Sequence, residues 1–220
     1  MFIHLIRITM RSLIKALNLN FFFKVNSLIW LMLLRLNNIK VGENFYIEGN
    51  ILLKLKGKKN ISFIEFGNNV SIFGNLDLRT REEGSIKVWN NVSFDNDVRI
   101  IAARSSIINI HSGCEIGKGT IINAGANLTM EENTLIGSNC LLQASNHGIS
   151  LEGPIKGQPY KHSAIHIGKG SWLASNVVVL PGREIAEGSV IGASTVVTKN
   201  TLPNSINVGN PVRDIGNRLK

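Results

Sequence analysis

Apolar residues recur at every sixth position along the C-terminal part of the chain. Between residues 165 and 213 the branched or long apolar positions are Ile167, Leu173, Val179, Ile185, Ile191 and Val197. Small or β-branched residues follow most of them at a spacing of four, namely Ser171, Val177, Ser189 and Thr195. A period of six fits neither an amphipathic helix, with its period of 3.6, nor a strand, with its period of 2. It predicts an all-β solenoid in which each six-residue unit forms one face of a coil.

The same repeat extends back to Val41, with longer spacings at 54–65, 80–87 and 102–109. If three units make one coil, residues 41–200 form about seven coils, stacked as parallel strands into a prism on the order of 30 Å long. Gly and Asn commonly separate the units, and both residues tolerate the left-handed backbone that sharp corners need. We therefore predict three parts: a helical segment (1–40), the solenoid (41–200) and a C-terminal tail (201–220).

The N-terminal segment has a helical pattern. The polar residues His4, Arg7, Arg11, Lys15 and Asn18 share one side of a predicted helix, and a second apolar stretch, FFFKVNSLIWLMLLRL, follows. No charge-free run here approaches the ~20 residues that a membrane-spanning helix needs. Two interpretations stay open for residues 1–36: a cap over the open end of the solenoid, or a basic amphipathic segment lying on an anionic membrane surface.

Charge and cysteine content narrow the function classes. The net charge is +9, and residues 1–42 hold six Lys or Arg and no Asp or Glu, so the remainder carries only +3 (9 − 6). We expect no nucleic-acid binding, because the chain lacks an aromatic-interleaved basic patch. Cys114 and Cys140 occupy small-residue positions of the repeat, which favours core packing in a reduced, cytoplasmic protein over a disulfide framework. No signal-peptide cleavage pattern follows the first apolar stretch.

The repeat breaks after His147, where the sequence HGISLEGPIKGQPYKHSA predicts an extruded loop near 148–163. The motifs SNH, IGxxxW, LPG, VIGA, VVTK and GNP surround and follow this break. Together they resemble the hexapeptide-repeat O-acetyltransferases, the family of the galactoside, maltose and bacterial surface-polysaccharide or O-antigen acetyltransferases. The resemblance implies a left-handed parallel β-helix, a homotrimer with sites between subunits, and acetyl transfer from acetyl-CoA to a carbohydrate hydroxyl.

The resemblance also implies roles for individual residues. His147 is expected to act as the general base by direct transfer, because a neutral imidazole near pH 7 can take the proton of an acceptor hydroxyl. The expected contacts of acetyl-CoA are Trp172, Ala174, Ser175, Ala193, Thr198, Lys199 and Arg213. An oxyanion donor is expected from a backbone N–H near Ala174 and Ser175. No metal ion is expected to take part.

Substrate contacts are harder to assign. Residues of the loop and its neighbourhood that fit hydrogen bonds to a sugar are Asn127, Asn146, Glu152, Gln158 and Tyr160, and an ordinary polar loop explains each of them equally well. Arg183 stands at an inward position, where either the coil opens or an acidic partner on a neighbouring chain is needed. Two other functions stay open: a non-catalytic scaffold, and a zinc enzyme of the solenoid carbonic anhydrase type that uses His111 and His147.

Overall fold

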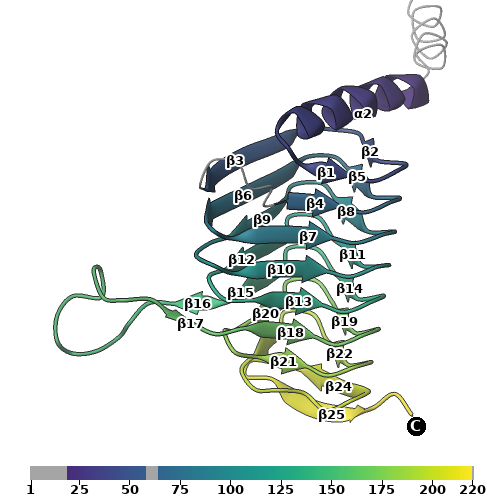
Figure 1. Cartoon of the computed structure of the whole chain (residues 1–220). Helices are drawn as coiled ribbons and strands as arrows, with labels where there is room; N and C mark the ends of the chain where they lie inside the picture. Colours follow the sequence, from purple (N-terminus) through teal and green to yellow (C-terminus); the bar gives the residue numbers. More distant parts are fainter. Residues whose placement is uncertain (1–18, 58–63, 220) are drawn as a thin grey trace, which may run out of the picture.

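The chain winds into a stack of coils beneath a single helix, as Figure 1 shows. The computed structural model describes residues 19–57 and 64–219. Each coil contributes one strand to each of three parallel faces, and seven such coils follow one another from β1 to β23. This parallel β-solenoid confirms the fold class that the six-residue period predicts.

Three stacks of strands make up the solenoid. The first face comprises β1 (Lys40–Val41), β4 (Ile64–Phe66), β7 (Ser85–Val88), β10 (Ile107–Ile110), β13 (Leu128–Met130), β18 (Ile165–Ile167) and β21 (Glu184–Ile185). The second comprises β2 (Tyr46–Ile47), β5 (Ser71–Phe73), β8 (Ser93–Asp95), β11 (Glu115–Ile116), β14 (Leu135–Ile136), β19 (Trp172–Leu173), β22 (Val190–Ile191), β24 (Ser205–Val208) and β25 (Arg213–Asn217). The third comprises β3 (Ile51–Gly57), β6 (Leu76–Glu82), β9 (Val98–Ala102), β12 (Ile121–Ala124), β15 (Leu141–Gln143), β20 (Val178–Val179) and β23 (Val196–Val197).

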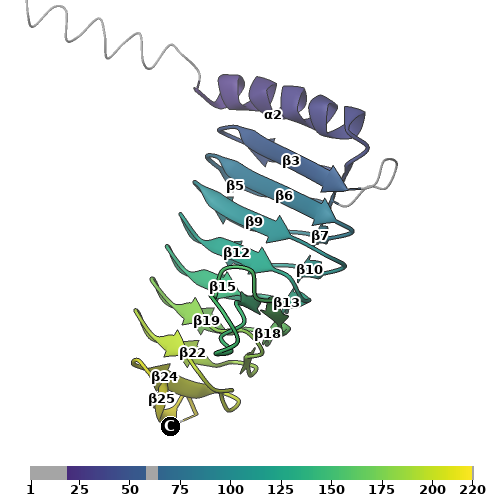
Figure 2. The same cartoon turned by 90° about the vertical axis from the view of Figure 1, so that its left-hand side faces the viewer.

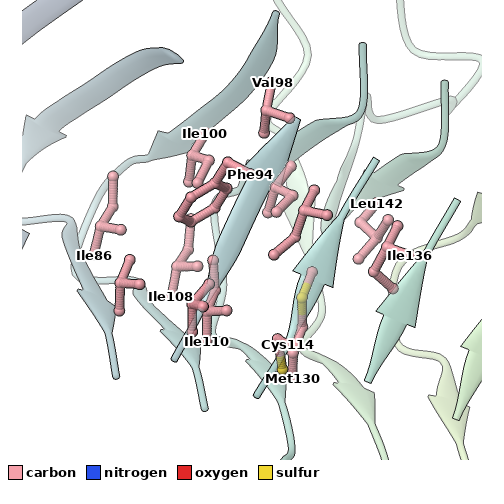
Figure 3. Packing of buried hydrophobic residues seen from close by; sticks show 14 of the residues in the cluster. Ile86, Phe94, Val98, Ile100, Ile108, Ile110, Cys114, Met130, Ile136 and Leu142 are labelled. Carbon is pink, nitrogen blue, oxygen red and sulfur yellow. The ribbon is translucent and has the colours of Figure 1, made fainter. Parts of the chain in front are cut away.

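The core is a column of side chains that the repeat places in register. Ile110 pairs with Met130, and Met130 pairs with Ile167, so that equivalent apolar residues stack from coil to coil. Figure 3 shows this packing around Phe94. All six apolar positions of the C-terminal repeat have no exposed side-chain area. Burial of each such aliphatic side chain contributes roughly 1.5–3 kcal/mol, and no coil buries its apolar face without its neighbours.

Asparagines stabilise one corner of the prism. Asn44, Asn69 and Asn91 adopt left-handed backbone conformations, with φ of 54°, 56° and 56°. Their side chains form a ladder, in which Asn44 Nδ2 donates to Asn69 Oδ1 (2.9 Å) and Asn69 Nδ2 donates to Asn91 Oδ1 (2.8 Å). The predicted role of Asn at the corners is therefore confirmed, because Asn supplies both the backbone angle and a hydrogen bond between coils.

Helix α2 (Leu19–Leu36) covers the end of the first coil, as the cap interpretation predicts. The open edge of β2 is satisfied by two polar side chains of the helix. Ile47 N–H donates to Ser27 Oγ (2.8 Å), and Asn26 Nδ2 donates to the carbonyls of Ile47 (3.2 Å) and Gly49 (2.8 Å). Leu34, a residue of α2 itself, is fully buried. The predicted amphipathic stretch at residues 1–18 lies outside the described residues.

Neither α2 nor any other helix of the described ranges is long and apolar enough to cross a membrane. At the opposite end of the prism, β25 folds back antiparallel on β24 and closes the second face.

Candidate functional site

An arm leaves the solenoid after β15 and returns before β18. Its base is the antiparallel pair β16 (Ser145–Asn146) and β17 (Lys161–His162). The hairpin between them projects away from the coils in Figure 1, and it points toward the viewer in Figure 2. Gly148 N–H donates to Pro159 O at 3.0 Å and continues the pairing. The arm, residues 145–162, corresponds to the loop that the break in the repeat predicts.

The side chain of Gln158 fixes the fold of the arm itself. Its Oε1 accepts from Ser150 N–H (2.8 Å), and its Nε2 donates to the carbonyls of Ser150 (2.8 Å) and Gly153 (3.0 Å). These bonds use most of the polar capacity of the amide. Glu152 lies on the same outer part of the arm and is exposed.

His147 lies at the base of the arm with its side chain exposed to solvent. The ring of Tyr160 packs against it, with 4.3 Å between ring centroids and 40° between the planes. Tyr160 in turn stacks on His162, at 6.0 Å and 18°. Ser145 Oγ and His162 Nδ1 are hydrogen-bonded at 2.9 Å. The imidazole of His147 is thus held on one face by an aromatic row anchored to the solenoid.

His162 and Ser145 are site residues that the sequence analysis misses. They meet because β16 and β17 pair in the register Ser145↔His162. The close approach of His162 to the backbone of Gly125 in the preceding coil leaves no room for a β-carbon there. The nearest sequence signal is Gly125 itself, since an isolated glycine in a strand-rich segment suggests a close approach of another group.

The predicted substrate contacts on the coil side lie around this base. Asn146 is in β16, paired with Lys161, and is exposed. Asn127 lies at the corner that precedes β13, where its Oδ1 accepts from Ile107 N–H at 2.9 Å. His147, Tyr160 and Asn146 are therefore close together at the base, whereas Asn127 has a role in holding two coils together.

A second group of predicted residues lines the corner between the second and third faces. Ala174 and Ser175 follow β19, and Ala193 stands at the equivalent corner one coil later, where Ser194 N–H donates to Ser175 O at 3.0 Å. Ala174 N–H donates to Ile191 O (2.8 Å). In contrast, the N–H groups of Ser175 and Ala193 donate to no protein acceptor in the part of the chain that the structure describes. This corner thus offers two exposed amides flanked by small side chains.

Trp172 and Arg213 extend this corner. Trp172 begins β19, pairs with Leu135 and Val190, and leaves 46% of its surface exposed. Arg213 opens β25 and pairs with Val208, whose side chain lies against Gly192 beside Ala193. The flat aromatic surface of Trp172 and the backbone of Arg213 thus adjoin the corner that carries the two free amides.

Thr198 and Lys199 lie elsewhere, at the corner that joins β23 to the tail. The carbonyl of Thr198 accepts from Arg183 Nη1 (3.2 Å), and Arg183 Nε donates to Pro181 O (3.2 Å). The guanidinium of Arg183 therefore binds backbone carbonyls of its own chain and is half-buried, which explains the misfit at this position without an opened coil.

One chain does not bring the two groups together. His147 belongs to the arm, which leaves the solenoid after a strand of the third face. Trp172 lies in a strand of the second face, and Ser175 lies at the corner that follows it. Figure 1 shows the arm projecting from the side of β15 and β13, with β19 and β22 on the other side of the prism.

The structure also separates the two histidines of the predicted zinc alternative. His111 follows β10 on the first face, whereas His147 follows β15 on the third face, so the two histidines lie at different corners of the prism. Among the described residues, the group with metal-ligand spacing is instead His111, Glu131 and Glu132. A groove of about 430 Å³ on the N-terminal coils, lined by residues such as Asp77, Asp97 and Arg99, contains none of the predicted site residues.

Comparison with protein families decides the type of repeat. Residues 164–199 match the bacterial transferase hexapeptide family model (six repeats). These residues, which form the last two coils from β18 to β23, are thus similar to bacterial transferase hexapeptide repeats. The match begins just after the arm, so the hexapeptide segment includes Trp172, Ser175 and Ala193.

Relatives of known sequence match the same kind of segment. Galactoside O-acetyltransferase of Escherichia coli (strain K12) is 38% identical over 96 residues, which cover 42% of this chain and 47% of that protein. A Staphylococcus aureus (strain COL) protein, classed provisionally as an acetyltransferase, is 48% identical over 77 residues, 34% of each chain. The matched hexapeptide segment thus spans less than half the length of these relatives.

A solved structure shares the fold over a longer range. The N-acyltransferase AntD of Bacillus cereus, crystallised with dTDP-4-amino-4,6-dideoxyglucose and coenzyme A, superposes with a TM-score of 0.56. The alignment covers 81% of this chain and 83% of AntD at 21% identity. The likeness shows a common fold.

Proposed function

We propose that this protein is an O-acetyltransferase that moves an acetyl group from acetyl-CoA to a carbohydrate hydroxyl, in a surface polysaccharide or O-antigen precursor. The observation that carries the proposal is the exposed His147 at the base of the arm, which leads into the hexapeptide segment at residues 164–199. Galactoside O-acetyltransferase, whose name describes transfer to a sugar hydroxyl, is 38% identical to this chain over 96 residues. A repeat alone does not define a reaction, so the proposal rests on the histidine and its surroundings.

The environment of His147 suits a general base. One ring face packs on Tyr160, and the side chain is open to solvent, so a ring nitrogen can reach an acceptor hydroxyl. In the proposed step, His147 takes the hydroxyl proton as the acceptor oxygen forms a bond to the thioester carbonyl carbon. The tetrahedral intermediate then expels the coenzyme A thiolate, which takes the proton back from the imidazolium. The products are the acetyl ester and free coenzyme A.

The corner between the second and third faces fits the acetyl-CoA side of the reaction. The free N–H groups of Ser175 and Ala193 suit the amide carbonyls of a pantetheine arm, and the N–H of Ser175 is also a candidate oxyanion donor. Ala174 is the less suitable donor, because its N–H is already bonded to Ile191 O. Trp172 offers an apolar surface, and the cations Arg213 and Lys199 suit the phosphates of the nucleotide.

A homotrimer would bring together the two groups that one chain keeps apart, namely His147 on the arm and the corner around Trp172 and Ser175. If the active site lies between two subunits, as the resemblance implies, His147 of one chain acts on acetyl-CoA bound near Trp172 of the next. Neither prism then carries a complete site alone.

The reaction is tested by incubating labelled acetyl-CoA with a panel of polysaccharide precursors that carry free hydroxyls, and with an amino sugar for comparison. We expect the wild type to label a hydroxyl acceptor, and His147→Ala and His147→Gln to lose roughly 10²–10⁴-fold in transfer rate. His111→Ala serves as a matched histidine control and should keep the rate. Equal transfer by wild type and His147→Ala would contradict the mechanism. Complete absence of coenzyme A binding would instead favour a non-catalytic scaffold.

We further propose that the enzyme works in the cytoplasm at the inner face of the cell membrane, beside a lipid-linked acceptor. The observation behind this is the outward face of α2. Its exposed apolar residues follow helical spacing and are 37–71% exposed: Phe21, Phe22, Val25, Leu28, Ile29, Met32, Leu33 and Leu36. A continuous apolar stripe of this kind marks an interaction surface.

Charge selects anionic lipid as the occupant of this stripe, which we call the α2 stripe. Lys24 and Arg35 flank it, and residues 1–42 contain no acidic residue. A second copy of α2 would bring basic residues against basic residues without an acidic complement. An anionic lipid surface supplies both the opposite charge and an apolar layer for the stripe.

A further inference from the structure

Two histidines and three glutamates form a cluster across successive coils of the first face. His111 Nδ1 lies 3.7 Å from Glu132 Oε1, and the ligand atoms of His111, Glu131 and Glu132 all lie within 4.8 Å of one another. His166 Nε2 lies 3.1 Å from Glu131 Oε1, and His166 Nδ1 lies 3.9 Å from Glu184 Oε1.

Strand register brings these residues together from distant parts of the sequence. Ile110 pairs with Met130, so His111 and Glu131, the next residue of each strand, stand side by side. His166 pairs with Thr129 in the preceding coil and with Glu184 in the following, last coil. In Figure 1, β10, β13, β18 and β21 are stacked in this order. The cluster therefore extends over four successive coils.

The carboxylates of the cluster have no strong cationic partner. Within residues 19–57 and 64–219, the ion pairs of Glu131, Glu132 and Glu184 are with imidazoles and none is with Lys or Arg. The nearby Lys87 ammonium instead lies over the ring of Trp89, 4.2 Å from its centroid. Local negative charge in this cluster is thus left for another cation to balance.

The ring of His111 is held in place. Trp89 stacks against it, with 5.4 Å between centroids and 15° between planes, while Nδ1 is directed to Glu132. An imidazole that packing already holds in one orientation loses little conformational freedom when it binds a metal ion. The side chains are partly exposed, at 27% for His111 and 30% for Glu131, so an ion can enter from solvent.

We propose that this cluster binds one Zn²⁺ ion per chain, with His111, Glu131 and Glu132 as the three protein ligands and a water molecule as the fourth. Zinc favours four nitrogen and oxygen ligands at roughly 2.0–2.2 Å, which puts donor atoms roughly 3.3–3.6 Å apart in a tetrahedron. The ligand atoms of His111, Glu131 and Glu132 lie within 4.8 Å of one another, and the distance of 3.7 Å from His111 Nδ1 to Glu132 Oε1 is close to this range. Small rotations of the glutamate side chains bring the set to bonding distance. His166 Nε2, 3.1 Å from Glu131 Oε1, orients that carboxylate from the next coil.

The proposed ion cross-links coils and takes no part in acetyl transfer. Its ligands come from the coils of β10 and β13, and His166 of β18 holds Glu131, so bound Zn²⁺ opposes the separation of these coils. Neighbouring-coil contacts determine the stability of a solenoid. Binding to the folded state alone raises that stability further.

The test uses the full chain, stripped of metal with a chelator and titrated with Zn²⁺ by calorimetry, with Mg²⁺ for comparison. We expect one Zn²⁺ per chain and at least roughly 100-fold weaker binding of Mg²⁺, which prefers an all-oxygen site. Zn²⁺ at about 100 times its Kd should raise the Tm by roughly 5–10 °C. Added Co²⁺ should give the visible absorption of a tetrahedral site.

Variants separate this site from other zinc contacts. The double variant His111→Ala/His166→Ala should bind Zn²⁺ at least about 10-fold more weakly and lose the Tm shift. The isosteric Glu131→Gln/Glu132→Gln variant should do the same while keeping the shape of the side chains. His162→Ala, which removes a histidine outside the cluster, should bind as the wild type does. Zn²⁺ binding weaker than about 1 mM, or unchanged in the double variant, would overturn the proposal.

Acetyl transfer by His111→Ala should equal that of the wild type whether or not zinc binds. Failure of the metal site and failure of the proposed function are therefore distinguishable.

Discussion

The two cysteines lie at core positions that threonine and serine fill in other coils. Cys114 and Cys140 are both free and buried, and Cys114 Sγ donates to Glu131 O at 3.1 Å. Burial raises the pKa of the Cys114 thiol to about 11 and also raises that of Cys140. Only the thiolate is nucleophilic, so both thiols are inert in the folded chain. This agrees with their predicted packing role in the core.

We predict that neither thiol reacts with a disulfide reagent such as Ellman's reagent at pH 8 in the native protein, and that both react in denaturant. The pKa of the Cys114 thiol is 9.0 in the unfolded chain and about 11 in the folded protein. Between pH 9 and about 11 the folded state therefore binds more protons than the unfolded state. The free energy of unfolding should therefore fall as the pH rises through this range. A thiol that is titrated rapidly in the native state would contradict the burial seen here.

At the scale of the element, α2 has two faces with different roles. Ser27 and Asn26 complete the hydrogen bonds of β2, and Leu34 packs on the first coil. The α2 stripe lies on the opposite side and is exposed. The cap and the membrane interpretation are therefore compatible, since each uses a different face of one helix.

We predict that Leu28→Glu/Met32→Glu, at the centre of the α2 stripe, reduces flotation with phosphatidylglycerol vesicles by at least about 10-fold. Each substitution removes roughly 1.5–3 kcal/mol of apolar burial and adds a repelled charge. Leu202→Glu is the matched control, because Leu202 is also exposed but follows the last coil, at the other end of the chain. Binding of the wild type should weaken in high salt and with phosphatidylcholine vesicles.

Unchanged flotation of the double variant would exclude the α2 stripe as a lipid-binding surface. A change in molecular mass by light scattering, without any change in flotation, would instead assign the stripe to a contact between copies.

At the scale of the whole molecule, the prism separates the two halves of the proposed site. The arm with His147 leaves after the third face, and Trp172 starts a strand of the second face. A rigid stack of coils cannot bend to join them, because every coil is held by parallel ladders to its neighbours. Assembly of several chains is the way in which the proposed base and the proposed acetyl-CoA site can meet.

We predict complementation between two inactive variants. His147→Ala and Trp172→Ala should each transfer acetyl groups poorly alone. Co-refolded at equal amounts, they should recover about one quarter of the wild-type rate, because a quarter of the boundaries then pair an intact histidine with an intact tryptophan. If the mixed assemblies recover no acetyl transfer, or if a monomer is fully active, the site is not shared between chains.

Most of the fold could be predicted from the sequence, because the period of six reports directly on the inward position of each strand. Ile167, Leu173 and Val179 are predicted as core residues from spacing alone, and all three are fully buried. The break after His147 likewise predicts the arm. The local sequence pattern is enough to predict burial wherever a residue contacts its counterpart in the next coil.

What only the tertiary structure decided is which distant residues meet. His162 reaches Ser145 through the pairing of β16 with β17, and the register of the first face brings Glu131 to both His111 and His166. These registers depend on the lengths of the corners between strands. The corners differ in length, and the six-residue repeat does not predict those lengths. The sequence by itself determined the coil and its core, since burial depends on local spacing. The structure determined the clusters, since the distance between two side chains depends on every residue between them.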